Sequence, residues 1–248
     1  MELPLFPLHT VLCPGIAIPL HIFEERYREL VRHCIETESP FGIVLIRDGR
    51  EVGGGEVSFS AIGTVAEIRQ AGRHPDGRYD LLVVGTRRFS IDDVSADERP
   101  YLVAEATILD EEVGDEEAVE RIANRATRRF VTYLELLQPR AGESAEEIDV
   151  RVEVETEQII GGEPGEDDEP LEPSDRRVVI PDDPTTLSYL LAGILQVELP
   201  RRQELLEADT TEQRLAQLLG LIDREIFLLR RRLRAFTPTA ESLGLRGS

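Results

Sequence analysis

The sequence contains no lysine: all 28 basic residues among its 248 residues are arginine. Several kinds of site need a lysine amine, which the permanently charged guanidinium of arginine does not replace. They are the phosphate-binding loop of the GxxxxGK[ST] type, the Ser-Lys catalytic dyad and the Schiff-base lysine. The absence of lysine excludes these three kinds of site from the sequence.

Cysteine and long apolar runs are also scarce. Cys13 and Cys34 are too few for a disulfide scaffold, and Cys34 falls on the apolar face of a predicted helix, where a thiol packs as a small hydrophobe. The chain begins Met-Glu without a basic segment, and no apolar run approaches the roughly 20 residues of a membrane helix. We therefore expect a protein of the reducing cytoplasm that is neither secreted nor membrane-spanning.

Positive charge is outweighed: 49 acidic residues against 28 basic ones make the formal charge −21. This balance disfavours nucleic acid and anionic membranes as partners, because both repel a strongly acidic protein. Neither GxSxG nor HExxH occurs, and acidic residues are too numerous for any pair of carboxylates to indicate a site. The sequence predicts a protein that is not an enzyme, with no catalytic or cofactor-binding residues.

The four histidines offer little evidence for a metal site. The one candidate set of ligands lacks the close CxxC or HxxxH spacing of zinc sites; it consists of His9, Cys13, His21 and Cys34. We predict no bound metal, and we expect His9, His21, His33 and His74 to be exposed or hydrogen-bonded at strand ends.

Residues 1–112 have the pattern of a small β-rich unit with one helix. Prolines interrupt short apolar segments before residue 23, as in the strands of a curled sheet, and a helical period of three and four then begins. Further strands are predicted over 41–46, 60–70, 78–85, 87–92 and 101–109. The glycine-rich run 47–56 is interpreted as a connection rather than a phosphate site, because neither a helix start nor a lysine follows it.

Residues 113–238 have a helical pattern, interrupted at about 140–177 by an acidic insert that we expect to be disordered. Helices are predicted to start at Asp115, at Asp183-Pro184, at Pro200 and at a capping box of Asp209 and Glu212. The wide apolar face of the last helix favours packing inside a bundle over self-association, and a homodimer through this helix stays an alternative. Residues 239–248 are expected to be frayed.

Densely spaced arginines close the last helix at Arg230, Arg231, Arg232 and Arg234. As cations in the last turns they complement the negative end of the helix dipole, which is the favoured interpretation. Binding of an acidic partner or of RNA is the alternative. No aromatic residues that stack bases are interleaved with these arginines, which weakens the RNA interpretation.

Several segments of the chain, taken together, resemble a known family. The stretch LPLFPLHTVLCPGIAIPLHIFEERYRELV, from Leu3 to Val31, resembles the opening signature of the Lon-type substrate-binding domain. FGIVLI, IGTVAEI, LLVVGTRRFSI and YLVAEATILDE follow in the order usual for that family, and LPRRQELLEADTTEQRLAQLLGLIDREI resembles its C-terminal helical segment. The resemblance covers most of the chain except the acidic insert.

The resemblance implies an α+β fold in which a PUA-like β-barrel with one packed helix precedes an α-helical bundle. It implies a bacterial, non-catalytic module that recognises unfolded or extended polypeptide, as an adaptor or regulator of proteolysis with a protease as a partner. We expect a stand-alone member, since the sequence has no room or lysines for the ATPase and Ser-Lys protease modules of full Lon proteases. The alternatives are an RNA-binding PUA-like protein and a small-molecule-binding protein.

The motif residues of the resemblance also imply roles. Phe23 and Tyr27 are expected in the core, Arg26 in a structural ion pair, and Glu25 free to contact a ligand. Phe23, Glu25 and Arg26 are the candidate peptide contacts, with structural roles for this group favoured over ligand roles.

Overall fold

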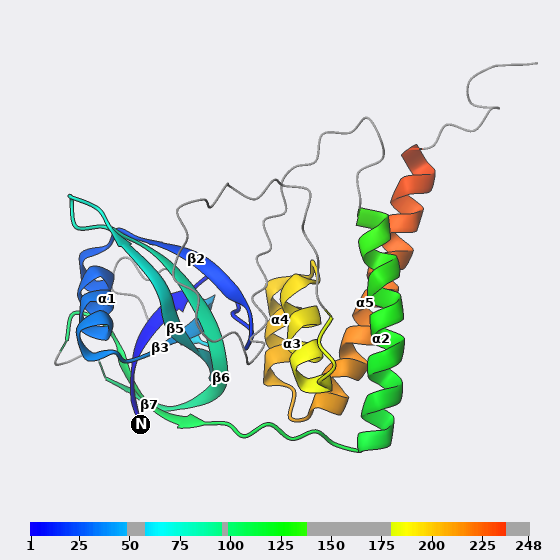
Figure 1. The fold of residues 1–248 in the computed structure, drawn as a ribbon, viewed down its shortest axis with the longest axis horizontal. Coiled ribbons are helices and arrows are strands. Elements are labelled where there is room, and N and C mark those ends of the chain that lie inside the picture. The colour runs from blue at the N-terminus through cyan, green and yellow to red at the C-terminus, as the bar shows by residue number, and fades with distance from the viewer. Residues whose placement is uncertain (49–57, 96–98, 138–179, 237–248) are drawn as a thin grey trace, which may run out of the picture.

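The computed structural model describes residues 1–48, 58–95, 99–137 and 180–236. Its strands are β1 (Glu2–Leu8), β2 (Ala17–Ile22), β3 (Phe41–Asp48), β4 (Ser58–Phe59), β5 (Ile62–Arg73), β6 (Tyr79–Ser95) and β7 (Val103–Ile108). Its helices are α1 (Glu25–Thr37), α2 (Glu116–Leu137), α3 (Pro184–Ile194), α4 (Leu199–Glu207) and α5 (Thr211–Phe236). The α+β fold class is confirmed: a β-barrel with α1 at its side is followed by four helices (Figure 1). The predicted acidic insert and frayed C-terminus lie outside the described residues.

The strands close into a barrel. They are hydrogen-bonded in the order β1-β7-β6-β5-β3-β4, and β1 also pairs with β3 in parallel, which joins the two sides. Strand β2 lies outside this order: it pairs with the first half of β6 and carries Pro19. Because proline lacks an amide hydrogen, Pro19 suits a strand with a neighbour on one side.

Helix α1 packs on the barrel through one apolar face. Tyr27, Leu30, Val31 and Cys34 are buried, and the Phe6 and Tyr27 rings meet edge to face with centroids 4.3 Å apart. Ile35 lies off this face and is 42% exposed. The helix ends at Glu38, which adopts a left-handed φ of 50°, immediately before Ser39 and Pro40. The prediction of a helix against a small barrel is confirmed.

The bundle helices begin with side-chain caps. Asp115 accepts a hydrogen bond from the Ala118 amide at 2.7 Å, and Asp183 accepts one from the Thr186 amide at 2.7 Å, both at the predicted starts. The capping box predicted from Asp209 and Glu212 is wrong.

Thr210 caps α5 instead, because its hydroxyl accepts a hydrogen bond from the Gln213 amide at 3.1 Å. Glu212 accepts a hydrogen bond from the Asp115 amide at 3.0 Å and so ties the start of α5 to the start of α2. Helix α5 then lies beside α2 (Figure 1). The buried face of α5 is narrower than the wide apolar face expected from the sequence, since Phe227 and Leu228 are 63% and 42% exposed.

A single apolar core runs from the barrel into the bundle. It joins Phe6 and Phe41 of the barrel to Phe130, Leu190 and Ile222 of the helices, all of them buried. The two parts of the fold are thus packed against each other rather than strung on a linker. Within the described residues, no helix has both the length and the apolar character needed to cross a membrane.

The largest difference from the predicted strands concerns Gly85. We expected one strand to end there and another to begin at Arg87, but β6 is continuous over 17 residues. A Cβ atom on Gly85 would lie 2.5 Å from the carbonyl oxygen of Cys13. Glycine is therefore present because the loop before β2 crosses the strand closely, not because the strand breaks.

We predict that Gly85→Ala lowers the free energy of unfolding by about 1–3 kcal/mol, because the backbone around Cys13 must move to admit the methyl group. Urea unfolding followed by circular dichroism measures the effect. Gly220→Ala is the matched control: its Cβ meets nothing within 4 Å on α5, so we expect a stabilisation of about 0.5–1 kcal/mol. Equal effects of the two substitutions would contradict the close crossing.

Candidate functional site

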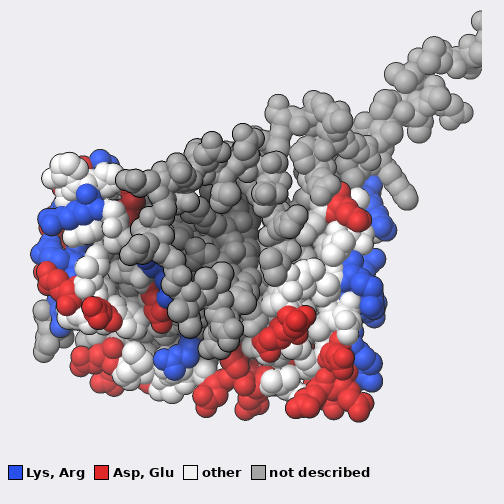
Figure 2. Space-filling model, in the orientation of Figure 1, with Lys and Arg blue, Asp and Glu red and all other residues white. Residues whose placement is uncertain are grey.

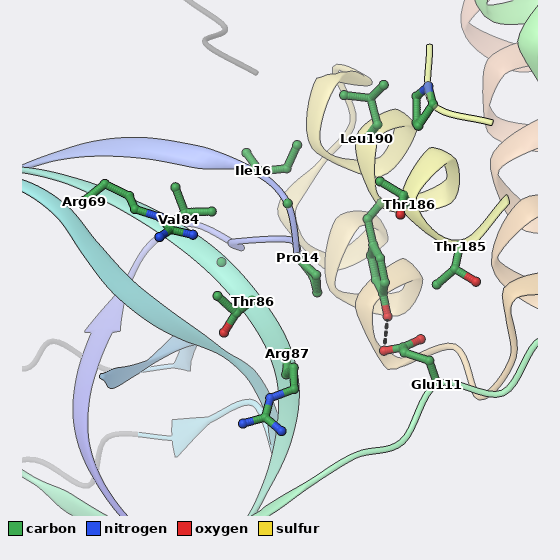
Figure 3. Close-up of a pocket in the computed structure, with 14 residues that line it drawn as sticks. Pro14, Ile16, Arg69, Val84, Thr86, Arg87, Glu111, Thr185, Thr186 and Leu190 are labelled. Atoms are coloured by element: carbon green, nitrogen blue, oxygen red, sulfur yellow. Dashed lines mark hydrogen bonds between the residues drawn. The ribbon is translucent and has the colours of Figure 1, made fainter. Parts of the chain in front are cut away.

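A cleft of about 380 Å³ lies where the barrel meets the bundle (Figure 3). Its apolar wall combines Ile16 and Val84 from the barrel with Leu190 from α3, and Arg69, Arg87 and Glu111 supply its charged groups. The charged lining of the cleft thus consists of two arginines and one glutamate.

The barrel wall of the cleft is held in shape by backbone hydrogen bonds. Gly15 donates to the Gly85 carbonyl at 2.8 Å, and Gly85 donates to the Ile16 carbonyl at 3.0 Å. Gly15 has a φ of 76°, a left-handed conformation that glycine adopts without strain. The loop that carries Ile16 is therefore fastened to β6 and presents Ile16 to α3.

Glu111 lies at the base of the cleft, in the segment between β7 and α2. Its carboxylate accepts hydrogen bonds from Tyr189 Oη at 2.6 Å and from Arg88 Nε at 2.8 Å, and a weaker one from Arg214 Nη2 at 3.4 Å. Its side chain remains 32% exposed. Three parts of the chain, namely β6, α3 and α5, thus converge on one carboxylate.

Arg88 and Arg214 donate hydrogen bonds to the carbonyl groups at the end of α4. Arg88 is 2% exposed and donates to the carbonyls of Leu206 and Ala208 at 2.9 and 2.7 Å. Arg214 is fully buried and donates to the Leu205 carbonyl at 3.1 Å. The last carbonyls of a helix lack partners within the helix, and burial makes unmet carbonyls costly. These guanidinium groups supply the missing donors.

Burial also sets the ionisation of this group. Burial raises the pKa of Tyr189, and the hydrogen bond to Glu111 raises it further. The phenol therefore stays protonated and donates a hydrogen bond to Glu111. Burial lowers the pKa of Arg214, while the charge of Glu111 opposes that shift. The Arg214 guanidinium also lies over the Tyr189 ring, 3.9 Å from its centroid, a cation–π contact.

The hydroxyl groups of the described cleft lining are already engaged in hydrogen bonds within the chain. Thr185 shares a hydrogen bond with Thr211 at 2.8 Å, and the Thr186 hydroxyl donates to Asp183 at 2.7 Å. Tyr189 is committed to Glu111. The lining therefore offers a ligand apolar surface and exposed positive charge, an arrangement suited to binding.

A second groove, of about 350 Å³, lies beside the start of α1. Phe23 borders it and is 62% exposed, and the ring of Tyr27 forms part of its buried wall. The remaining apolar lining comes from Phe6, Leu8, Ile22 and Ile46. An exposed aromatic beside an apolar groove is a common feature of interaction surfaces.

Comparison with known proteins decides the family. Residues 2–224 match the model of the family described as "ATP-dependent protease La (LON) substrate-binding domain". The chain belongs to this family. The N-terminal domain protein of Lon from Xanthomonas campestris shares the fold of this Lon substrate-binding domain with a TM-score of 0.56 and 27% identity, over 89% of this chain and 98% of that one.

Other relatives agree. The N-terminal domain of Mycobacterium avium complex Lon protease has the same fold, with a TM-score of 0.55 and 17% identity over 90% of this chain and 98% of that one. Lon protease of Escherichia coli K12 is 25% identical over 233 residues, which cover 92% of this chain and 25% of that protein. This chain thus spans about a quarter of the length of the Lon proteases of Azospirillum brasilense and Escherichia coli K12.

The structure distinguishes among the motif residues of this Lon substrate-binding domain. Tyr27 is buried and Arg26 pairs with Glu24 at 2.9 Å, as expected. The expectation that Phe23 is a core residue is wrong, because its ring lies on the surface where α1 begins. Glu25 has an exposed side chain but forms an ion pair with Arg28, so it is not free as expected.

Sequence reasoning missed the residues that join barrel to bundle. Arg88, Glu111 and Arg214 are three among 77 acidic and basic residues, and their partners lie up to 120 positions away along the chain. No local spacing could single them out. The candidate ligands His9, Cys13, His21 and Cys34, for which we predicted no bound metal, do not converge; among the described residues the group that converges is His21, His74 and Asp80.

We predict that Arg88→Met lowers the free energy of unfolding by about 3 kcal/mol or more, because it leaves two buried carbonyls and the Glu111 carboxylate without their main donor. Thermal and urea unfolding measure the loss. Arg87→Met, one residue earlier and exposed, is the control, with a change within about 0.5 kcal/mol. Similar stability of the two variants would show that Arg88 does not hold the junction.

Proposed function

We propose that this chain is a non-catalytic module that binds unfolded or extended segments of other polypeptides. The observation that carries the proposal is Phe23, an aromatic ring 62% exposed at the edge of an apolar groove, within the stretch that carries the family signature. Burial of an aromatic side chain at the centre of an interface is a common source of binding energy. An apolar residue of a bound segment would cover Phe23 and enter the groove.

Glu25 and Arg26 lie in the chain between Glu24 and Tyr27, which line this groove, and are proposed as secondary contacts. Both already have partners within the chain: Glu25 pairs with Arg28, and Arg26 pairs with Glu24 and lies over the Tyr27 ring at 4.6 Å. Exchange of one exposed ion pair for another has a small net energy. These two residues would therefore orient a bound segment more than hold it.

The cleft between barrel and bundle is proposed as a second contact surface. Its apolar wall is set in shape by the hydrogen bonds of Gly15 and Gly85, so a ligand meets a preformed surface. Arg69 and Arg87 lie at this cleft in a protein whose net charge is −21. Acidic side chains gather along the lower edge of the molecule, over the connection from β7 to α2 (Figure 2). The two arginines thus favour segments that carry acidic as well as apolar residues.

The absence of an enzymatic role is part of the proposal. The matched family is the substrate-binding domain of Lon, not its ATPase or protease domains. In the described lining of the cleft, the hydroxyl groups of Thr185, Thr186 and Tyr189 are held by internal hydrogen bonds. A partner protease would receive the bound polypeptide. The buried, unpaired thiols of Cys13 and Cys34 support a reducing compartment such as the cytoplasm.

We predict that Phe23→Ala weakens the binding of a fluorescently labelled unfolded polypeptide by about tenfold, as the loss of an aromatic anchor implies. Fluorescence anisotropy titrations measure the dissociation constant. Phe227→Ala is the control, because Phe227 is equally exposed, at 63%, but lies on α5. Equal affinity of the wild type and both variants would remove the groove from the proposal, and no saturable binding by the wild type would refute the function itself.

We also predict that Arg87→Glu weakens the binding of acidic unfolded polypeptides by about twofold or more at low salt, and less at high salt, because it reverses an exposed charge at the cleft. The matched control is Arg125→Glu, the same charge change at an exposed position of α2. The same anisotropy titration compares them. An equal loss in both variants would indicate a general charge effect and exclude the cleft as the contact surface.

A further inference from the structure

Three metal-ligating side chains converge at the end of the barrel that carries the turn between β5 and β6. His21 Nδ1 lies 2.6 Å from Asp80 Oδ1, and His74 Nε2 lies 2.6 Å from Asp80 Oδ2. One ligand atom from each residue can be chosen so that all three lie within 4.8 Å of one another. The three side chains belong to β2, to the turn after β5 and to β6.

The backbone holds the three residues in place. His21 and Asp80 are direct partners in the antiparallel pairing of β2 with β6, and Gly72 pairs with Asp80 on the other side of β6. His74 is fixed in the turn, where its amide donates to the Arg78 carbonyl at 2.9 Å and its carbonyl accepts from the Gly77 amide at 3.0 Å. Only side-chain rotation is needed to bring the ligand atoms around an ion.

We propose that His21, His74 and Asp80 bind a divalent transition-metal ion of the zinc class, with water in the remaining coordination positions. Two imidazole nitrogens and one carboxylate oxygen suit Zn²⁺, Co²⁺ or Ni²⁺, whereas Mg²⁺ and Ca²⁺ require mainly oxygen ligands. Metal–ligand bonds of about 2.1 Å separate the ligand atoms of a tetrahedral ion by about 3.4 Å, so the imidazoles must shift by on the order of 1 Å.

The charges around the group favour a cation there. Asp80 supplies a carboxylate whose two oxygens each lie 2.6 Å from an imidazole nitrogen. Arg78 is paired with Asp76 at 2.7 Å, which offsets its positive charge. A metal ion would replace the two imidazole hydrogen bonds to Asp80 with coordinate bonds from the same three side chains.

The site is open to solvent. The side chains of His21, His74 and Asp80 are 48%, 41% and 58% exposed. Three protein ligands with accessible remaining positions resemble a metal site that exchanges its water ligands, rather than a closed structural site. His21 also borders the groove beside the start of α1, the Phe23 groove. The His21 and Phe23 rings are stacked with centroids 6.3 Å apart. An ion held here would lie next to that groove.

The test is calorimetric titration of the full chain, freed of metal by a chelator, with Zn²⁺ alone. We expect one saturable site, and we expect His74→Gln and Asp80→Asn each to weaken it by at least about tenfold, as the loss of a ligand implies. The side chains of His74 and Asp80 are 41% and 58% exposed, so we expect the variants to fold, which circular dichroism verifies. The control is His33→Gln, a histidine on α1 outside the group, with less than about a twofold effect.

Nuclear magnetic resonance gives an independent readout, because the chain has four histidines whose imidazole signals can be assigned. We expect Zn²⁺ to shift the signals of His21 and His74 and to leave those of His9 and His33 unchanged. Two results would overturn the proposal. One is the absence of saturable binding at Zn²⁺ concentrations up to about 1 mM, because a dissociation constant above that value would be weaker than those of metal sites in proteins. The other is equal affinity of the wild type, His74→Gln and Asp80→Asn.

Discussion

The fold depends on how the buried end of α4 obtains hydrogen-bond donors. Its last carbonyls face the barrel, where water does not reach them, and two guanidinium groups meet them: Arg88 from β6 and Arg214 from α5. Moving such charges out of water costs several kcal/mol each, which good hydrogen bonds and an opposite charge must offset. Glu111 supplies that charge and also accepts from Tyr189 of α3. One cluster therefore joins the barrel to three helices.

This junction explains why the cleft has a defined shape. The barrel wall is fastened through Gly15 and Gly85, the helical wall is held through Tyr189 and Glu111, and an apolar core continues beneath both. A rigid surface loses little entropy when a flexible polypeptide binds, which favours a module whose partners are themselves disordered. The Phe23 groove is formed by β1, the end of β2 and α1, so both proposed contact surfaces are parts of one packed body.

Much of the fold could be predicted from the sequence, because its signals are local. These signals depend on neighbouring residues: the helical period after Phe23, the caps at Asp115 and Asp183, and the sequence of strand segments. The family resemblance then implied how these segments are arranged as a barrel followed by a bundle. The break predicted after Gly85 was wrong for the same reason: glycine inside a strand locally resembles a break, whereas it is required here by the close approach of Cys13, 72 positions earlier in the chain.

The candidate sites were less predictable, because long-range pairing creates them. His21 and Asp80 are 59 positions apart and meet only because β2 pairs with β6. Phe23 was expected in the core as a motif residue of the family resemblance, but α1 begins two residues later and the ring lies at the surface. The junction arginines resemble surface charges in a sequence that is 31% charged.

We infer that the buried arginine cluster makes barrel and bundle one cooperative unit. Native-state hydrogen exchange tests this inference most directly, by comparing the opening free energies of the slowest amides in β5 and β6 with those in α3 and α5. We expect one common value that equals the global free energy of unfolding. Bundle amides that exchange through a separate opening of lower free energy, while the barrel stays protected, would contradict it.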